Sequence, residues 1–436
     1  MKHFFFFLSI ISSFTLFSQT EDTSEIGSFS EVGLYTMDEV LDVNTLRDEL
    51  KVLYPDATFI SEPPKTINKT MVYLSAIDNV SENYPVYEME FLDYFAEGFT
   101  LAQKKKLIAT KNAVLCVIFY KKKDAFTHHK KFTEWIYETI KDTDFVAYDG
   151  ETREYFLPET WKTRRVDTWE NGLPSIVDHI TGHSYRQEAF CRTITLGMQR
   201  FGLPDLVIEN TACSNVNTAN HLITVIAQLM IEGQEVTVDD FEVNLKNIKS
   251  KRLQEMLEDL MYENASKATT VSFKEATRDE GDPFNMLLEI NFNNENYPNP
   301  QAFQDATFKE LFGSEDDITH VNHNEEILAA SERAKKRLPA LRKLFNDGLD
   351  AGNNLLLKAP FTTDDGGNEW MWIEVTKWTG ETIEGILQNE PYYIKDLKSG
   401  TKVTIQQADV FDYIFQKSDG TSEGNETGRL IAKYGN

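Results

Sequence analysis

Cysteine is scarce in this chain of 436 residues, which contains only Cys116, Cys191 and Cys213. Three thiols cannot form the disulfide framework that holds small secreted domains together, so packing must provide the stability. Cys116 lies inside the apolar run AVLCVIF and is expected to be a small buried side chain. Cys191 and Cys213 could pair, although their spacing alone does not show it.

Basic residues are also few, since 44 lysines and arginines accompany 70 acidic residues and the net charge is -26. This charge would repel a phosphate backbone, so we expect no nucleic-acid partner. The sequence has no Gly-rich phosphate loop, no Gly-x-Ser-x-Gly elbow, no His-Glu-x-x-His motif and no paired-cysteine metal motif. These absences disfavour the common enzyme classes, and no cofactor is predicted.

Long hydrophobic runs are missing except near the start, where Met1-Lys-His precedes the apolar residues 4–17. A basic start followed by a hydrophobic segment of this length is typical of a secretory signal and is short for a membrane span. We predict that residues 1–19 are a cleaved signal peptide, with an uncleaved anchor as the alternative. The mature chain is then expected to be soluble, to have no membrane segment, and to be periplasmic or secreted.

Apolar periodicity in the rest of the chain predicts a multidomain α+β protein. Residues 30–165 and residues 166–335 each mix helical patterns with strand-like runs, and each is predicted to form a sandwich-like α+β domain. Residues 340–436 contain short strands with Gly and Asp turns at close spacing, which predicts a small β-barrel-like domain. A long helical pattern precedes that domain, and Pro339 is expected to kink or interrupt it.

Three of the six tryptophans lie within the nine residues WMWIEVTKW, at Trp370, Trp372 and Trp378. The strand period of two gives this segment an apolar face, formed by Met371, Ile373 and Val375. The three tryptophans and Glu374 would share the opposite face. That face either packs against the preceding helix, which we favour, or binds a ligand. We expect Trp372→Ala to destabilise the protein and Trp378→Ala to be mild.

His179 and His183 are the strongest candidates for metal ligands, because residues four apart in a strand point to the same face. Asp178 and Glu188 are nearby, but no third ligand can be identified. We favour hydrogen-bonded structural histidines over a metal site. The adjacent pair at 128–129 would diverge on a helix and is a weaker candidate still.

Motifs near the C-terminus carry a family resemblance. Lys358-Ala-Pro-Phe361, Glu369-Trp-Met-Trp372 and Asn389-Glu-Pro391 resemble the YegJ-like family of uncharacterised bacterial domains. The segment RTITLGMQRFGLPDL at residues 192–206 is similar to the region that accompanies this domain in longer members. The resemblance implies a fold more than an activity, because the family has no established reaction to carry over.

The resemblance also implies a candidate binding patch, in which Trp372 and its neighbours lie beside Asn389 on an adjacent strand. The candidate residues are Trp370, Trp372, Trp378, Asn389, Tyr392 and Tyr393. An aromatic patch rimmed by acids suits a protein, peptide or glycan partner. The leading prediction is an exported, non-enzymatic binding or interaction protein, and the alternative is a metal-dependent hydrolase that uses His179 and His183.

Overall fold

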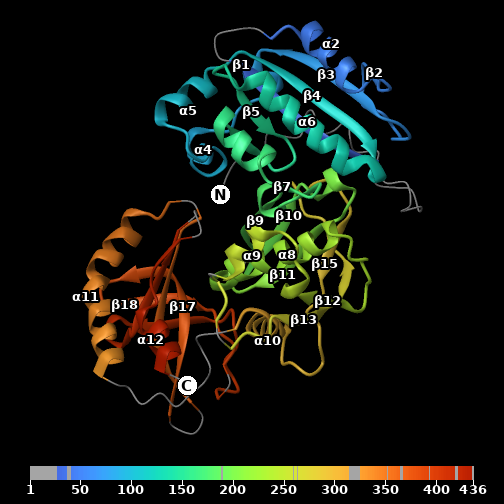
Figure 1. Ribbon diagram of the computed structural model, residues 1–436. Helices are drawn as coiled ribbons and strands as arrows, with labels where there is room; N and C mark the ends of the chain where they lie inside the picture. The colour runs from blue at the N-terminus through green and yellow to red at the C-terminus, as the bar shows by residue number, and fades with distance from the viewer. Residues whose placement is uncertain are drawn as a thin grey trace.

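The computed structural model describes residues 27–36, 41–187, 190–258, 260–262, 264–313, 325–350, 352–363, 367–391, 393–417 and 421–434. Three large sheets with attached helices follow one another along the chain (Figure 1). The predicted mixed α+β class is therefore confirmed. The predicted signal peptide lies outside the described residues. Within the described ranges, no helix is both long enough and apolar enough to cross a membrane.

The first sheet has helices on both faces. Its strands, in spatial order, are β2 (Thr58–Ile60), β3 (Met71–Asp78), β4 (Asn112–Lys121), β1 (Gly27–Thr36), β5 (Val146–Asp149) and β6 (Glu154–Phe156). One face packs against α2 (Val43–Leu53) and α6 (Ala125–Ile140), and the other against α3 (Val80–Asn83), α4 (Met89–Phe95) and α5 (Leu101–Ile108). The helix α7 (Pro158–Trp161) follows β6. Because β4 is buried on both sides, its sequence is apolar throughout instead of alternating.

The second sheet packs against α8 (Val216–Ile231), and the apolar side chains of this helix belong to one hydrophobic core cluster with side chains of the sheet. The spatial strand order is β14 (Phe273–Glu275), β15 (Leu287–Ile290), β11 (Asp205–Thr211), β10 (Phe190–Leu196) and β9 (Thr181–Gln187). The strands β11 and β15 are parallel.

Smaller elements complete this region. They are the paired strands β7 (Trp169–Glu170) and β8 (Leu173–Pro174), the paired strands β12 (Phe241–Asn244) and β13 (Ala268–Val271), and the helices α9 (Lys251–Glu258) and α10 (Pro300–Phe312). Short helical turns occur at η2 (Lys122–Asp124), η3 (Lys162–Val166), η4 (Ile176–Asp178), η5 (Met198–Phe201), η6 (Cys213–Asn215), η7 (Leu245–Asn247) and η8 (Gln407–Asp409).

The third sheet is open, so the predicted barrel-like form is wrong. Its antiparallel strands, in spatial order, are β19 (Lys402–Gln406), β18 (Thr382–Leu387), β17 (Asn368–Thr379), β16 (Asn354–Thr362), β20 (Asp412–Gln416) and β21 (Ser422–Gly424). The helix α11 (Glu325–Asp347) covers one face through Ala334, Leu338 and Leu341, and α12 (Glu426–Tyr434) follows β21 (Figure 1). Because α11 buries the apolar face of this sheet, the sheet does not have to close into a barrel to bury that face.

Pro339 lies inside α11, and the helix continues past it to Asp347. Of the two effects expected of Pro339, a kink or an interruption, the interruption is therefore wrong. The side chain of Pro339 is exposed, so the neighbouring Leu338 and Leu341 still reach the core cluster. Burial of one apolar stripe offsets the backbone hydrogen bond that a proline removes from a helix.

Cys191 and Cys213 form a disulfide with a Cα–Cα distance of 5.1 Å. The bond joins β10 to η6, the turn that leads into α8. Cys116 is free and buried on β4, as expected for a small apolar side chain.

Candidate binding site on the C-terminal sheet

The strand β17 divides its tryptophans between two faces. Its pairing with β18 shifts register between Val375 and Lys377, where a bulge adds one residue. Trp378, which is only 3% exposed, therefore lies in the core cluster with Met371 and Ile373. The prediction that all three tryptophans share a face is wrong for Trp378, because one extra residue inverts the alternation. The ring of Trp378 belongs to the same cluster as side chains of α11, which is the packing that we favoured for the tryptophans.

Trp370 and Trp372 lie on the opposite face of β17. Trp372 is 7% exposed, and the Nζ atom of Lys358 lies over its ring, 5.4 Å from the centroid. Trp370 is partly buried and packs against Phe411, with 4.5 Å between ring centroids. We name Trp370, Trp372 and Phe411 the aromatic row. It lies away from α11, so packing against that helix does not explain it.

The loop after β18 supplies the remaining candidate residues. The backbone N–H of Trp372 donates to Oδ1 of Asn389 at 2.6 Å. The backbone N–H of Tyr393 donates to Oε2 of Glu369 at 3.1 Å, and the Tyr393 side chain is 53% exposed. Tyr392 lies outside the described residues. The structure therefore brings Trp372 together with Asn389, and holds Tyr393 close to the residue before Trp370.

A buried charged pair lies beside the aromatic row. Lys358 on β16 and Asp412 on β20 are register partners, and both are buried. The backbone N–H and the hydroxyl of Thr427 donate to Oδ2 of Asp412 at 2.8 and 2.6 Å. Burial raises the pKa of Asp412, while the hydrogen bonds and the charge of Lys358 oppose this shift. With its oxygens engaged in this way, Asp412 positions the start of α12.

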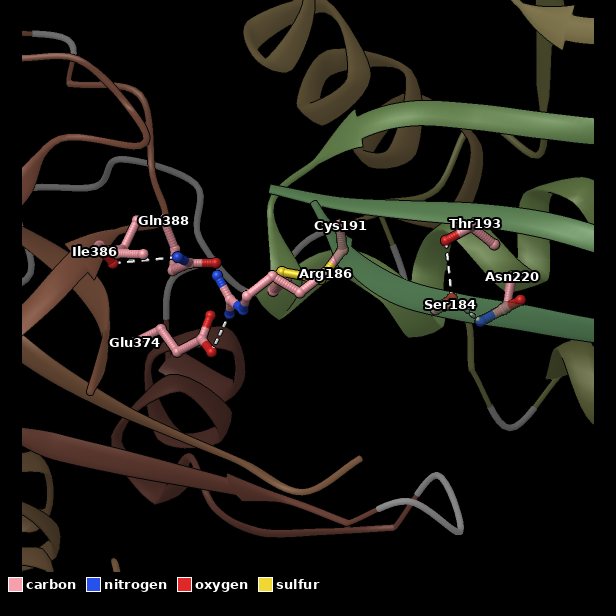
Figure 2. The surroundings of a disulfide bond; sticks show 9 residues. Ser184, Arg186, Cys191, Thr193, Asn220, Glu374, Ile386 and Gln388 are labelled. Atoms are coloured by element: carbon pink, nitrogen blue, oxygen red, sulfur yellow. Dashed lines mark hydrogen bonds and ion pairs between the residues drawn. A yellow bond between two sulfur atoms is a disulfide. The ribbon is translucent and has the colours of Figure 1, made fainter. Parts of the chain in front are cut away.

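The hairpin of β9 and β10 reaches the same face of the third sheet. Arg186, the register partner of Cys191, extends from β9 and donates to Glu374 on β17 (Figure 2). Glu374 is 7% exposed; burial raises its pKa, and the charge of Arg186 opposes this shift. A Cβ atom at Gly400 would lie 2.7 Å from the ring of Phe190, so this glycine permits a second close approach. The hairpin therefore borders the aromatic row on the side of Glu374.

His179 belongs to a buried chain of hydrogen bonds. Its Nδ1 atom lies 3.1 Å from Nε2 of His129, and its Nε2 atom lies 2.9 Å from the hydroxyl of Thr168. The Nδ1 atom of His129 lies 2.9 Å from the hydroxyl of Ser30 on β1. Burial lowers the pKa of both imidazoles well below the ordinary value, which favours their neutral forms. This hydrogen-bonded structural role is the one that we favoured for His179. Its partner His129 belongs to the adjacent pair at residues 128–129, which was the weaker candidate for a metal site.

His183 lies in different surroundings, so the prediction that both histidines share one strand face is wrong. The turn η4 ends at Asp178 and β9 begins only at Thr181, so His179 is not part of the strand. His183 contacts the rings of Tyr94 and Tyr185, and burial lowers its pKa to about 4.

The candidate third ligands do not complete a metal site. Asp178 pairs with Arg252 at 2.5 Å, and Glu188 lies outside the described residues. Across the part of the chain that the structure describes, no group of three His, Cys, Asp or Glu residues could hold a metal ion.

A buried ion network, which sequence reasoning missed, joins the first sheet to the second region. Asp149 at the end of β5 accepts hydrogen bonds from Arg165 at 3.0 Å and from Arg200 at 2.6 and 2.9 Å. Burial alone would raise the pKa of Asp149, but the two guanidinium groups outweigh this effect and lower it. Arg165 and Arg200 lie in the short helical turns η3 and η5, where no apolar periodicity signals the burial of an arginine, so only the tertiary structure reveals this network.

Comparison with known proteins identifies one related region. Residues 324–433 match the family DUF2314, described as an uncharacterized protein conserved in bacteria. The match includes α11, all six strands of the third sheet and most of α12. The aromatic row therefore belongs to the matched region, whereas Arg186 does not. Searches of curated proteins and of solved structures found no match.

Proposed function

We propose that this is an exported, non-enzymatic binding protein that holds a protein or peptide partner against Tyr393 and the aromatic row. The observation that carries the proposal is the 53% exposure of the Tyr393 side chain, in a loop whose backbone is hydrogen-bonded to Glu369, the residue before Trp370. Partly exposed tyrosine and tryptophan next to a packed aromatic base are typical anchors of protein interfaces. We also propose that the C-terminal region is a domain of the YegJ-like type.

The surroundings of Tyr393 favour binding without a large ordering cost. The hydrogen bond from its backbone to Glu369 holds the loop against β17, and the carboxylate of Glu390 accepts from the backbone of Ser399 at 2.9 Å. A loop held in advance loses less conformational entropy when a partner binds. The net charge of -26 favours a partner with a basic surface, and makes nucleic acid an unsuitable partner.

Export to the periplasm or the medium is part of the proposal. The basic and apolar N-terminal segment is typical of a secretory signal. The disulfide between Cys191 and Cys213 adds support, because disulfides persist mainly in oxidising compartments. No specific observation favours the alternative, a hydrolase with a metal at His179 and His183, because the two imidazoles have different partners.

Site-specific photo-crosslinking tests the proposed surface. A benzoylphenylalanine residue replaces Tyr393 in cells that make the protein, and irradiation should yield one discrete adduct with the mass of a protein. Adding Trp370→Ala should remove that adduct, because the change deletes a partly buried ring of the proposed surface, next in sequence to Glu369, which holds the backbone of Tyr393. The matched control places the same crosslinker at Tyr262, which is 38% exposed and lies in the second region.

Equal adducts at positions 393 and 262, or an adduct that survives Trp370→Ala, would contradict the proposed surface. Absence of any protein adduct at position 393 would contradict the proposed class of partner. Circular dichroism of Trp370→Ala must first show a folded protein, so that loss of the adduct is assigned to the surface.

A further inference from the structure

A pocket lies in the region of the second sheet, distant in sequence from the aromatic row. Its volume is about 140 Å³, and it lies between the end of β13, the loop after β15 and the helix α10. Its polar lining includes Asp239, Thr270, Ser272, Asn291 and Asn294. None of these side chains takes part in the surface proposed above.

The place of the pocket in the fold favours a ligand. Asn291 directly follows β15, which ends at Ile290 and runs parallel to β11. The amide of Gln301 on α10 donates to the carbonyl oxygen of Asn210, near the end of β11, at 2.9 Å. The pocket therefore borders the carboxyl end of β15, and the helix α10 that lines it also contacts the end of the parallel strand β11. Ligands of open α/β sheets bind outside the carboxyl ends of the strands.

Local turns hold the two asparagine side chains in place. The Oδ1 atom of Asn291 accepts from the backbone of Asn293 at 3.1 Å, and that of Asn294 accepts from the backbone of Asn296 at 2.9 Å. Each turn uses the carbonyl oxygen of the carboxamide and leaves its Nδ2 group as a donor. The carboxylate of Asp239 supplies acceptors, and the hydroxyls of Thr270 and Ser272 serve as either.

One wall of the pocket is aromatic. Phe303 on α10 is partly buried and stacks on Tyr297 with 4.7 Å between centroids. It also meets the buried ring of Phe292 edge-on at 5.9 Å. A rigid apolar wall opposite fixed amide, hydroxyl and carboxylate groups suits a ligand that has one apolar face and many hydroxyls.

We propose that this pocket binds one ring of a neutral carbohydrate. Among the described residues that line the pocket there is no lysine or arginine, so an anionic ligand would find no positive charge there, and Asp239 would repel it. A sugar ring offers adjacent hydroxyls that both donate and accept, which matches the mixed lining, and C–H groups that pack on Phe303. The volume is below the roughly 300 Å³ of a pocket for a drug-sized ligand, and it suits a single ring.

Saturation-transfer NMR on the mature chain tests this site with N-acetylglucosamine, galactose and mannose as separate probes. At least one probe should receive saturation from the protein. Asn294→Asp keeps the Oδ1 acceptor of the turn, replaces the Nδ2 donor with an acceptor oxygen and adds a negative charge, so the affinity for that probe should fall about tenfold. Asn296→Asp is the matched control, because it makes the same change in charge at an exposed side chain outside the lining.

Three results would overturn the site. They are no saturation transfer to any of the three sugars, equal affinity in Asn294→Asp and Asn296→Asp, and loss of binding in Tyr393→Ala, which would move the sugar to the other surface. If Asn294→Asp does not fold, Asp239→Asn replaces it. That exposed carboxylate keeps its shape as an amide, and the affinity should again fall about tenfold.

Discussion

Trp378 reaches the core because the bulge between Val375 and Lys377 adds a residue to β17, whereas Trp372, before the bulge, stays on the opposite face. The indole Nε1 of Trp378 is buried and has no hydrogen-bond partner among the described residues. The ring therefore contributes through packing, and its N–H group contributes nothing favourable.

Replacement of Trp378 measures this packing. Trp378→Ala should lower the free energy of unfolding by about 3 to 5 kcal/mol, in place of the mild effect expected from the sequence, because the ring is buried and its loss leaves a large cavity beside α11. Trp378→Phe should cost much less, since it keeps an aromatic ring and removes an unpaired N–H group. Chemical denaturation of both variants checks this, with Thr379→Ala at an exposed site as the control. A mild effect of Trp378→Ala would mean that the bulge is absent.

Asp205 gives a residue-scale prediction on pH. Its pKa is raised to about 6 by burial, against the hydrogen bonds from Asn285, Met198 and Thr195 and the charge of Arg200. The folded state therefore binds more protons than the unfolded state between about pH 4 and pH 6, and the contribution of Asp205 to stability falls as the pH rises through that range. Below pH 4 the contribution is fully present.

Asp205→Asn removes this titration. The free energy of unfolding of the wild type minus that of the variant should decrease from pH 4 to pH 6 and change little above about pH 7. Urea denaturation at a series of pH values provides the measurement. A difference that is constant from pH 4 to pH 7 would show that the pKa of Asp205 is not raised in the folded protein.

At the scale of the element, the disulfide ties the start of β10 to the turn before α8. Arg186 is the register partner of Cys191, so the same bond also holds the end of the hairpin that reaches Glu374. The bonded residues are 22 apart in sequence. A cross-link of this length stabilises mainly by limiting the unfolded chain.

Removal of the disulfide should therefore destabilise the protein. Cys191→Ala with Cys213→Ala should lower the free energy of unfolding by about 2 to 4 kcal/mol. Guanidinium denaturation with and without reductant checks this, because the wild type should lose stability in reductant while the double variant should not change. Equal midpoints for the oxidised and reduced wild type would contradict the expected stabilisation. Cys116 should stay unmodified by iodoacetamide in the native protein, because it is buried on β4.

At the scale of the molecule, a few polar contacts join regions that are distant in sequence. The ion pair of Arg186 with Glu374 links the second sheet to the region that matches DUF2314. Its carboxylate is largely buried while its guanidinium is partly exposed, so solvent weakens the interaction but does not cancel it. Loss of Arg186 alone would leave a buried carboxylate without its cation.

A double-mutant cycle measures this link. Arg186→Gln should lower the free energy of unfolding by about 1 to 3 kcal/mol, and adding Glu374→Gln should restore part of the loss. The matched control is the pair of Lys377 with Glu384, which is 2.7 Å apart and exposed in the same sheet, and whose coupling should be below about 1 kcal/mol. Equal coupling in the two pairs would show that the hairpin does not dock on β17.

Much of the secondary structure could be predicted because its causes are local. Apolar residues recur at helical spacing in α2 and α8, and they run almost without interruption through β4. Periodicity of apolar residues reflects which side of an element is buried, so it can be read without knowing the neighbours. In the candidate site, the positions of Trp370 and Trp372 on the face opposite Met371 were predictable in the same way, because these residues keep the strand alternation.

The sequence by itself determined the mixed α+β class, the scarcity of cysteine, the acidic charge and the positions of the main helices and strands. Only the tertiary structure decided that Trp378 faces the core, that His179 pairs with His129, that Cys191 joins Cys213 and that the third sheet stays open. The physical reason is the range of the interactions. Alternation and helical spacing act over a few residues, whereas a bulge, a buried polar pair, a disulfide and the edges of a sheet depend on which distant segment packs alongside.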